Sequence, residues 1–254
     1  MNTVIPVQLV PDLVEELLIN AEGVALDRDW LQLIISEFDD HAIEQGILLQ
    51  ERGAGDVIVL APDVEGAEDV LFSAAAKGAS RLIKFLGDFE GEVSNHALAA
   101  GFASAIKDLE PGLVLTGVQT HKDIDGQLGP LLAEQLEFPY VGYVSGVSVS
   151  ENRATVRKEY PGGVIAEFEV TLPAVLGIQS AEEPPRYVAF SKIRQAMNTA
   201  TIEEQTMAEA DISEVPEISR MYKPEVGERA TMLEGDFETI ASSLVDVLRE
   251  SGVL

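Results

Sequence analysis

The sequence predicts an α/β protein: a doubly wound, mostly parallel sheet with an added antiparallel hairpin and a C-terminal extended arm ending in a helix. Three observations lead to this fold. Up to about residue 180, short apolar runs alternate with amphipathic segments of helical period. From Val141 the pattern changes to strands in which apolar and polar residues alternate. Beyond residue 200 an acidic stretch without clear period precedes one last amphipathic segment. We therefore expect an α/β domain at residues 1–200 and an arm at 201–254.

The N-terminal elements begin with an apolar run, Val4–Val10, which suits a strand buried on both faces. Leu13–Asn20 and Val24–Leu26 flank a short Gly-containing turn and form a candidate hairpin. Glu37–Arg52 then places its apolar residues on one helical face, and Gly53 follows as a stop signal.

The alternation continues to residue 136. The expected elements are the strand Asp56–Ala61, the helix Glu68–Lys77, the strand Arg81–Phe85, the helix Ser94–Asp108, the strand Leu113–Thr116 and the helix Gln127–Leu136. Pro62 and Gly78 close the first two of these elements, and Ser94 is a candidate N-cap. Strands that alternate with such helices predict a parallel sheet.

The next segment predicts the antiparallel addition. Val147–Ser150, Thr155–Tyr160 and Val164–Leu172 alternate in polarity, and Pro161–Gly163 forms a tight turn between the last two. Ala174–Gln179 has the composition of a final buried strand.

The C-terminal part begins with an acidic, proline-containing loop, Ser180–Tyr187, and a helix at Ser191–Thr199. Residues 201–235 are too long for an ordinary loop and are interpreted as an arm. Asp236 is expected to cap a final amphipathic helix, Phe237–Arg249. The arm has two interpretations, packing on its own domain or embracing a partner subunit.

Composition restricts the class of partner and compartment. A net charge of −27 disfavours nucleic acid, whose phosphates this surface repels. The charge is compatible with simple solubility, with a salt-rich cytoplasm or with docking to a basic protein. The chain has no cysteine, no apolar run long enough to span a membrane and no signal-peptide pattern at its start. We expect a cytoplasmic protein without a membrane span.

The stretch Gly117–Pro130 carries most of the functional information. It joins a short apolar strand to a helix start, where unpaired N–H groups and the helix dipole favour phosphate. No nucleophile stands beside a base, so we expect no catalytic residue and no metal site. His121 is either a ligand contact or a structural residue, and Asp123 and Asp125 are interpreted as turn formers rather than as an acid/base or metal pair. The chain has neither a P-loop nor a G-x-G-x-x-G fingerprint.

Several segments together resemble the β (small) subunit of electron transfer flavoproteins over nearly the whole chain. Ser36–Glu44 (SEFDDHAIE) is similar to the family's N-P-F-D-E-x-A-x-E, and Ala74–Arg81 (AAAKGASR) to its A-L-A-x-G-A-D-R. Residues 117–134 (GVQTHKDIDGQLGPLLAE) are similar to G-x-Q-A-x-D-x-D-x-x-Q-V-G-P-x-x-A-E. The opening Val7–Asp12 and the closing Glu183–Tyr187 also match the family. Each motif is weak alone, but their order and spacing are fairly specific.

The resemblance implies an electron carrier that binds an adenine nucleotide, AMP or FAD, and pairs with an FAD-bearing α-like subunit. That pair would pass electrons between a flavin and a partner dehydrogenase or quinone reductase. By position the adenosine side would be lined by Pro6, Ser36, Glu37, Phe38 and Pro62. The phosphate would be met by Asp123, Asp125, Gly126, Gln127 and Leu128, with Gln119 and Lys122 in the same cofactor-binding set. Phe190 would be the apolar anchor that docks a dehydrogenase.

Two other functions remain open from the residues. One is a stand-alone adenine-nucleotide-binding or sensing domain without a redox role. The other is a small-molecule hydrolase or ligase, which the lack of cysteine and of any paired nucleophile and base disfavours.

Overall fold

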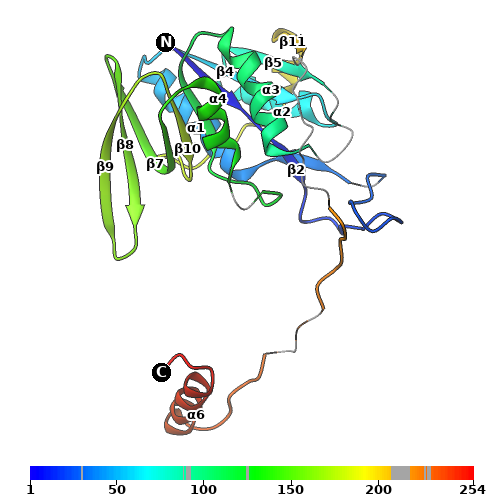
Figure 1. Ribbon diagram of the computed structural model, residues 1–254, viewed down its shortest axis with the longest axis vertical. Helices are drawn as coiled ribbons and strands as arrows, with labels where there is room; N and C mark the ends of the chain where they lie inside the picture. The colour runs from blue at the N-terminus through cyan, green and yellow to red at the C-terminus, as the bar shows by residue number, and fades with distance from the viewer. Residues whose placement is uncertain are drawn as a thin grey trace. The chain divides into compact units, whose positions relative to one another are not determined.

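The computed structural model describes residues 1–29, 31–87, 89, 93–123, 126–206, 218–225, 227 and 230–254. Two compact units are present, Met1–Arg220 and Met221–Leu254. The first unit contains a nine-stranded sheet with helices packed against it (Figure 1).

The large sheet confirms the predicted mostly parallel architecture. Its strands, in spatial order, are β11 (Ile202–Thr206), β5 (Arg81–Leu86), β4 (Asp56–Pro62), β1 (Asn2–Pro6), β6 (Pro111–Gly117), β10 (Ala174–Ile178), β7 (Tyr140–Ser150), β8 (Arg153–Tyr160) and β9 (Val164–Thr171). Every neighbouring pair from β11 to β7 is parallel, and β8 and β9 add the antiparallel hairpin. The hairpin lies at one end of the sheet (Figure 1).

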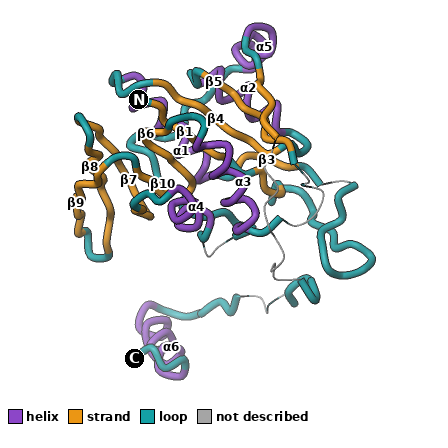
Figure 2. The backbone as a smooth tube through the Cα atoms, turned by 45° about the horizontal axis from the view of Figure 1, so that its top comes forward, coloured by secondary structure: helices purple, strands orange, loops and turns teal. Residues whose placement is uncertain are grey.

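Helices cover both faces of this sheet (Figure 2). The helices α1 (Glu37–Glu51) and α2 (Ala67–Lys77) belong to one core, and α3 (Asn95–Lys107) and α4 (Leu128–Leu136) belong to the other. In β4, Val59 faces the first core and Ile58 faces the second, because successive side chains of a strand point to opposite faces. The sequence of a strand that is buried on both faces is therefore a continuous apolar run.

The helices agree with the sequence predictions to within one residue at each end, including α5 (Phe190–Thr199) and α6 (Phe237–Glu250). The predicted N-caps are also confirmed. The Ser94 side chain accepts a hydrogen bond from the Ala97 N–H, and Asp236 accepts one from the Thr239 N–H.

The strand predictions were wrong at three places. The expected strand Val4–Val10 is divided, because β1 ends at Pro6 and a separate two-stranded sheet pairs β2 (Leu9–Pro11) with β3 (Leu33–Ile35). Of the hairpin expected at residues 13–26, the described residues form one isolated antiparallel bridge, Ile19 to Leu26. Finally, β7 begins at Tyr140 rather than at Val147, with a bulge between Val144 and Gly146 that interrupts the alternation.

The expected start of the arm at residue 201 is corrected by β11. Residues 202–206 pair with β5, and the pairing is reinforced by Arg81, which binds Glu203 at 2.8 Å, and by Lys84, which lies 3.3 Å from Glu204. Cross-strand ion pairs stabilise this edge although the strand itself is acidic. Part of the remaining arm, residues 207–217, lies outside the described residues.

The second unit carries α6, whose side chains are all at least partly exposed. Its apolar residues, such as Phe237, Leu244 and Val247, recur at helical spacing, and Phe237 is 94% exposed. Within the described part of the chain, no helix has both the length and the apolar character needed to cross a bilayer.

Candidate functional site at the carboxyl edge of the sheet

The candidate site lies at the end of β1, the strand from which the chain continues to opposite sides of the sheet. On one side of β1 lies β4, and on the other side lies β6, so the chain winds away from β1 in both directions. In open α/β sheets the carboxyl ends of strands at such a point border a ligand crevice. Pro6 ends β1, Pro62 ends β4 and Gly117 ends β6, which brings three strand ends to this edge.

Asp39, in the first turn of α1, ties these strand ends together. Its carboxylate accepts hydrogen bonds from the Gln8 N–H at 2.8 Å and from the Gly117 N–H at 2.7 Å. The side chain is 1% exposed. Burial raises the pKa of Asp39 to about 7, although both N–H donors act in the opposite direction. Asp39 therefore fixes the loop after β1 against the end of β6.

Gly117 is required by this arrangement. A Cβ at this position would lie 2.7 Å from Asp39 Oδ1 and 2.8 Å from the Phe38 Cβ. Asp39 was not predicted from the sequence, although its position in the helix could have indicated a buried acidic residue. Asp39 is an acidic residue that shares a helical face with Ile43 and Gly46.

The start of α1 places the predicted adenosine-side residues at the same edge. Ser36 is buried, and its N–H donates to the Gln8 carbonyl at 3.0 Å, while its side chain makes no capping hydrogen bond. Glu37 is exposed and Phe38 is half-buried. Pro6 and Pro62 are buried at the ends of two adjacent strands. The structure thus gathers this predicted group, and its role in binding stays a prediction.

The loop before α4 is built from local hydrogen bonds. Thr120 and Asp123 close a tight turn through backbone hydrogen bonds in both directions, and Asp123 Oδ2 accepts a bond from the Gln127 N–H at 3.2 Å. Gly126 has a φ of +64°, and a Cβ there would lie 2.4 Å from the Val118 carbonyl oxygen. Asp125 lies outside the described residues.

The first turn of α4 has properties that suit an anion. Gln127 occupies the N-cap position, but its side chain makes no capping hydrogen bond, and Pro130 has no N–H. The backbone N–H groups of Leu128 and Gly129 therefore belong to the unpaired donors of a helix start, where the dipole favours negative charge. Gln119 is half-buried and Lys122 is exposed beside this loop. A helix start of this kind favours an anion such as phosphate, and phosphate binding here stays a prediction.

Two of the three histidines have structural partners. His121 Nε2 is 2.9 Å from the Pro11 carbonyl oxygen, and His41 Nδ1 accepts a hydrogen bond from the Ala181 N–H at 3.2 Å. Among the residues that the structure describes, no group of three or more acidic, histidine or cysteine side chains could hold a metal ion.

A second feature is the loop that leads to α5, which is clamped to α1. The buried Glu44 accepts hydrogen bonds from the Arg186 backbone N–H and guanidinium at 2.9 Å, and Arg186 also binds Glu51 at 2.6 Å. Glu182 binds Arg52 at 2.7 Å, and this hydrogen bond is the main cause that lowers the pKa of Glu182 to about 2. Beyond the clamp Phe190, the predicted anchor, is 65% exposed. Its docking role stays a prediction.

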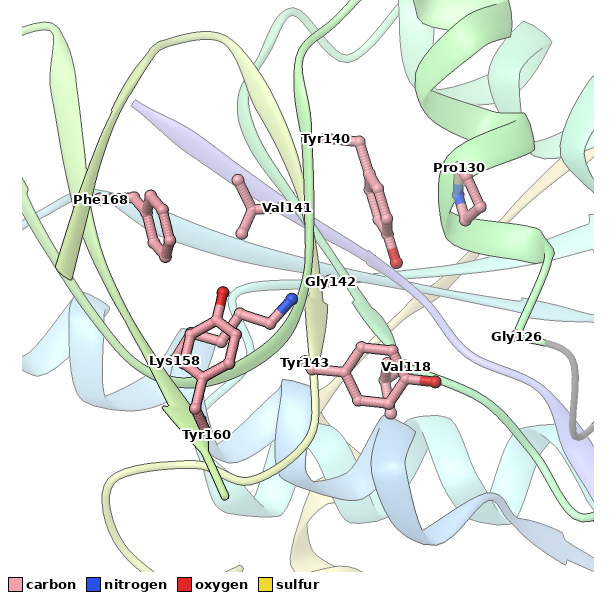
Figure 3. Close-up of a pocket in the computed structure, with 10 residues that line it drawn as sticks. All are labelled: Val118, Gly126, Pro130, Tyr140, Val141, Gly142, Tyr143, Lys158, Tyr160 and Phe168. Carbon is pink, nitrogen blue, oxygen red and sulfur yellow. The ribbon is translucent and has the colours of Figure 1, made fainter. Parts of the chain in front are cut away.

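A third feature was not predicted from the sequence. A pocket of about 530 Å³ lies between the start of α4 and the strands β7–β9 (Figure 3). Its walls include four aromatic side chains and one lysine, Tyr140, Tyr143, Tyr160, Phe168 and Lys158. Lys158 and Tyr160 lie two residues apart in β8 and therefore share one face of the strand. This spacing is the feature of the sequence from which part of the pocket could have been predicted.

Comparison with known proteins shows which family this chain matches. The model of the "Electron transfer flavoprotein domain" family matches residues 25–210. The chain is similar to the electron transfer flavoprotein subunit beta of Methylophilus methylotrophus, with 30% identity over 98% of both chains. It is also similar to the proteins of the same name from Bradyrhizobium diazoefficiens, at 26% identity over 100% of both chains, and Bacillus subtilis, at 27% identity over 98% of both.

Proposed function

The chain belongs to the electron transfer flavoprotein β-subunit family, and from this premise we propose that it is a nucleotide-binding subunit of an electron carrier. It would bind an adenine nucleotide, AMP or FAD, and pair with an FAD-bearing α-like subunit. The pair would carry electrons between a dehydrogenase and an acceptor such as a quinone reductase. The family supports the electron-transfer role, and the remaining assignments are supported by the geometry below.

The observation that carries the proposal is the uncapped mouth of α4 at the carboxyl edge of the sheet. Its N–H groups suit a phosphate, and Gly126 allows the loop before α4 to approach the Val118 carbonyl more closely than a side chain would permit. Pro6, Phe38 and Pro62 lie at the same edge and would border the adenosine. When bound, AMP would fix the loop geometry, whereas FAD would in addition supply electron transfer.

The second unit supports a partner subunit. Helix α6 has an amphipathic pattern and no buried side chain, so an apolar face including Leu244 and Val247 is left for another surface. We propose that residues from about 207 to 254 form the arm that holds the α-like subunit, with α6 as its anchor. In the first unit, the clamped loop before α5 would present Phe190 to the dehydrogenase. This chain would therefore act as a scaffold in the proposed cytoplasmic complex.

A stand-alone nucleotide-binding or sensing domain, with the arm folded on itself, is the alternative. The two functions predict different masses after co-expression with an α-like subunit, a heterodimer for the carrier and a single chain for the alternative. Light scattering on a gel-filtration column separates them.

Lys122→Glu should weaken nucleotide retention. Lys122 is exposed beside the α4 mouth, and reversing its charge should cost about 1.5–3 kcal/mol, or roughly 10- to 150-fold in affinity. The measurement is the nucleotide content per chain after a fixed number of washes. Lys107→Glu, at the exposed end of α3, makes the same change of charge and serves as the control. Equal nucleotide content in the two variants would refute the assigned contact.

A further inference from the structure

Asp39 is a buried carboxyl group without a counter-ion. Its side chain is 1% exposed, and among the described residues no lysine, arginine or histidine lies within ion-pair distance of it. The buried Glu44 on the same helix, by contrast, is bound by Arg186. Burial without a cation makes the ionised form of a carboxyl group costly, and such groups gather at functional sites.

The position of Asp39 joins it to the loop that carries the α4 mouth. Each carboxyl oxygen accepts one N–H, Oδ2 from Gln8 after β1 and Oδ1 from Gly117 at the end of β6. Gly117 is followed by Val118, and the Val118 carbonyl oxygen lies 2.4 Å from the place of a Cβ on Gly126. An ionised Asp39 and an anion at the mouth would therefore repel each other through the protein interior, where charges are screened little.

The charged surroundings of Asp39 do not relieve this repulsion. Burial is the main cause that raises the pKa of Asp39, and the charge of the neighbouring Asp40 raises it further. Asp40 is itself paired with Lys77 of α2. The strands β1, β6 and β10, which pack against α1, contain no ionisable residue.

Other elements around α1 do carry ionisable groups. These are Glu37, His41 and Glu44 of α1 itself, Glu68 and Asp69 of α2, Asp56 at the opposite end of β4, Tyr140 and Tyr143 of β7, and His121, Lys122 and Asp123 in the loop before α4. Within the described part of the chain, Asp40 is the group whose charge acts on the Asp39 carboxyl.

We propose that Asp39 takes up a proton from solvent when an anionic nucleotide binds at the α4 mouth, so that the nucleotide is held more tightly below neutral pH than above it. The proposal rests on the proposed function, which places a nucleotide there. The proton forms an O–H bond on the carboxyl group, and the neutral group still offers one oxygen to each of the two N–H donors. The repulsion is removed while both strand ends stay joined.

Asp39 is therefore a positioning residue through which pH regulates the nucleotide site. By linkage, protonation strengthens nucleotide binding by the same factor by which the nucleotide strengthens protonation.

The direct test is titration calorimetry of AMP binding at pH 7 to the complex with the α-like subunit, after its bound nucleotide is removed. Two buffers with different heats of ionisation give the number of protons taken up. The wild type should take up more protons per AMP than Asp39→Asn, and this difference excludes the titration of the AMP phosphate itself. Asp108→Asn, at the exposed end of α3, should match the wild type.

The pH profile gives a second readout. The ratio of the AMP affinity of the wild type to that of Asp39→Asn should fall about fivefold from pH 6 to pH 8. Asp40→Asn should move the loss of affinity to lower pH, because it removes the negative neighbour of Asp39. This variant keeps both hydrogen bonds of the Asp39 carboxyl, so it also serves if Asp39→Asn does not fold.

The results that count against the inference differ from those that count against the proposed function. If AMP binds and the wild type and Asp39→Asn take up equal numbers of protons, Asp39 is not the linked group, while the nucleotide site stands. An affinity ratio that is constant from pH 6 to pH 8 has the same meaning. If AMP binds at no pH, both the inference and the proposed function are overturned.

Discussion

Replacing Arg186 by methionine should lower the free energy of unfolding by about 3 kcal/mol, because it leaves a buried carboxylate without its counter-charge. The Glu44 side chain is only 2% exposed and lies 2.8 Å from the Arg186 guanidinium. Urea unfolding at pH 7 measures the change. The same variant should loosen the loop before α5 and weaken docking through Phe190.

Two further variants show whether the buried charge is the cause. Arg52→Met breaks the more exposed ion pair with Glu182 and should cost no more than about 1 kcal/mol. The double variant Glu44→Gln with Arg186→Met removes both charges, and the glutamine can still accept a hydrogen bond from the N–H of residue 186. It should recover at least half of the lost stability. A loss in Arg186→Met as small as that in Arg52→Met would contradict the clamp.

Replacing Asp39 by asparagine should destabilise the fold by about 2 kcal/mol near pH 5, because the asparagine sets an NH2 group against one of the two buried N–H donors, where the protonated carboxyl group still offers an oxygen. The asparagine oxygen can accept from either Gln8 or Gly117, while its amide group faces the other donor. The nucleotide site should loosen as well, since Asp39 joins the ends of β1 and β6.

The pH dependence of this difference has a definite sign. The pKa of Asp39 is about 7 in the folded chain, above its value of 3.8 in the absence of structure. A group with a raised folded pKa contributes stability at low pH and loses that contribution as the pH rises through the folded pKa. The stability difference between the wild type and Asp39→Asn should therefore shrink from pH 5 to pH 7.

The measurement is a series of urea unfolding curves from pH 5 to pH 8, above the isoelectric point of about 4.2, where the chain would lose solubility. Asp108→Asn, at the exposed end of α3, controls for the general titration of the acidic surface. If the difference between the wild type and Asp39→Asn is constant over this range, Asp39 is not the titrating group.

Much of the fold could be predicted from local patterns because helices and buried strands impose them directly. The apolar period of α1 and the caps of α3 and α6 are properties of adjacent residues, and the structure confirmed them. The strand β11 could not be found in this way. Its sequence, IEEQT, is acidic, and its stability depends on basic residues of β5 that are distant in the chain.

The features of the candidate site also differ in whether adjacent residues are enough to predict them. The α4 mouth could be predicted because a strand, a loop and a helix start follow one another in sequence. Asp39 and the tyrosine–lysine pocket could not, because each depends on how separate elements meet. Asp39 joins β1, β6 and α1, and Lys158 reaches Tyr143 only through the pairing of β8 with β7.

The central claim is that the α4 mouth holds an adenine nucleotide in a complex with a flavin-bearing subunit. The most direct test is the cofactor content of the chain co-expressed with an α-like subunit, measured by acid release and HPLC together with the mass of the complex. The account predicts a heterodimer that releases an adenine nucleotide from this chain, as AMP or as a second FAD, in addition to the partner's FAD. A single chain that elutes alone and releases no nucleotide would contradict it.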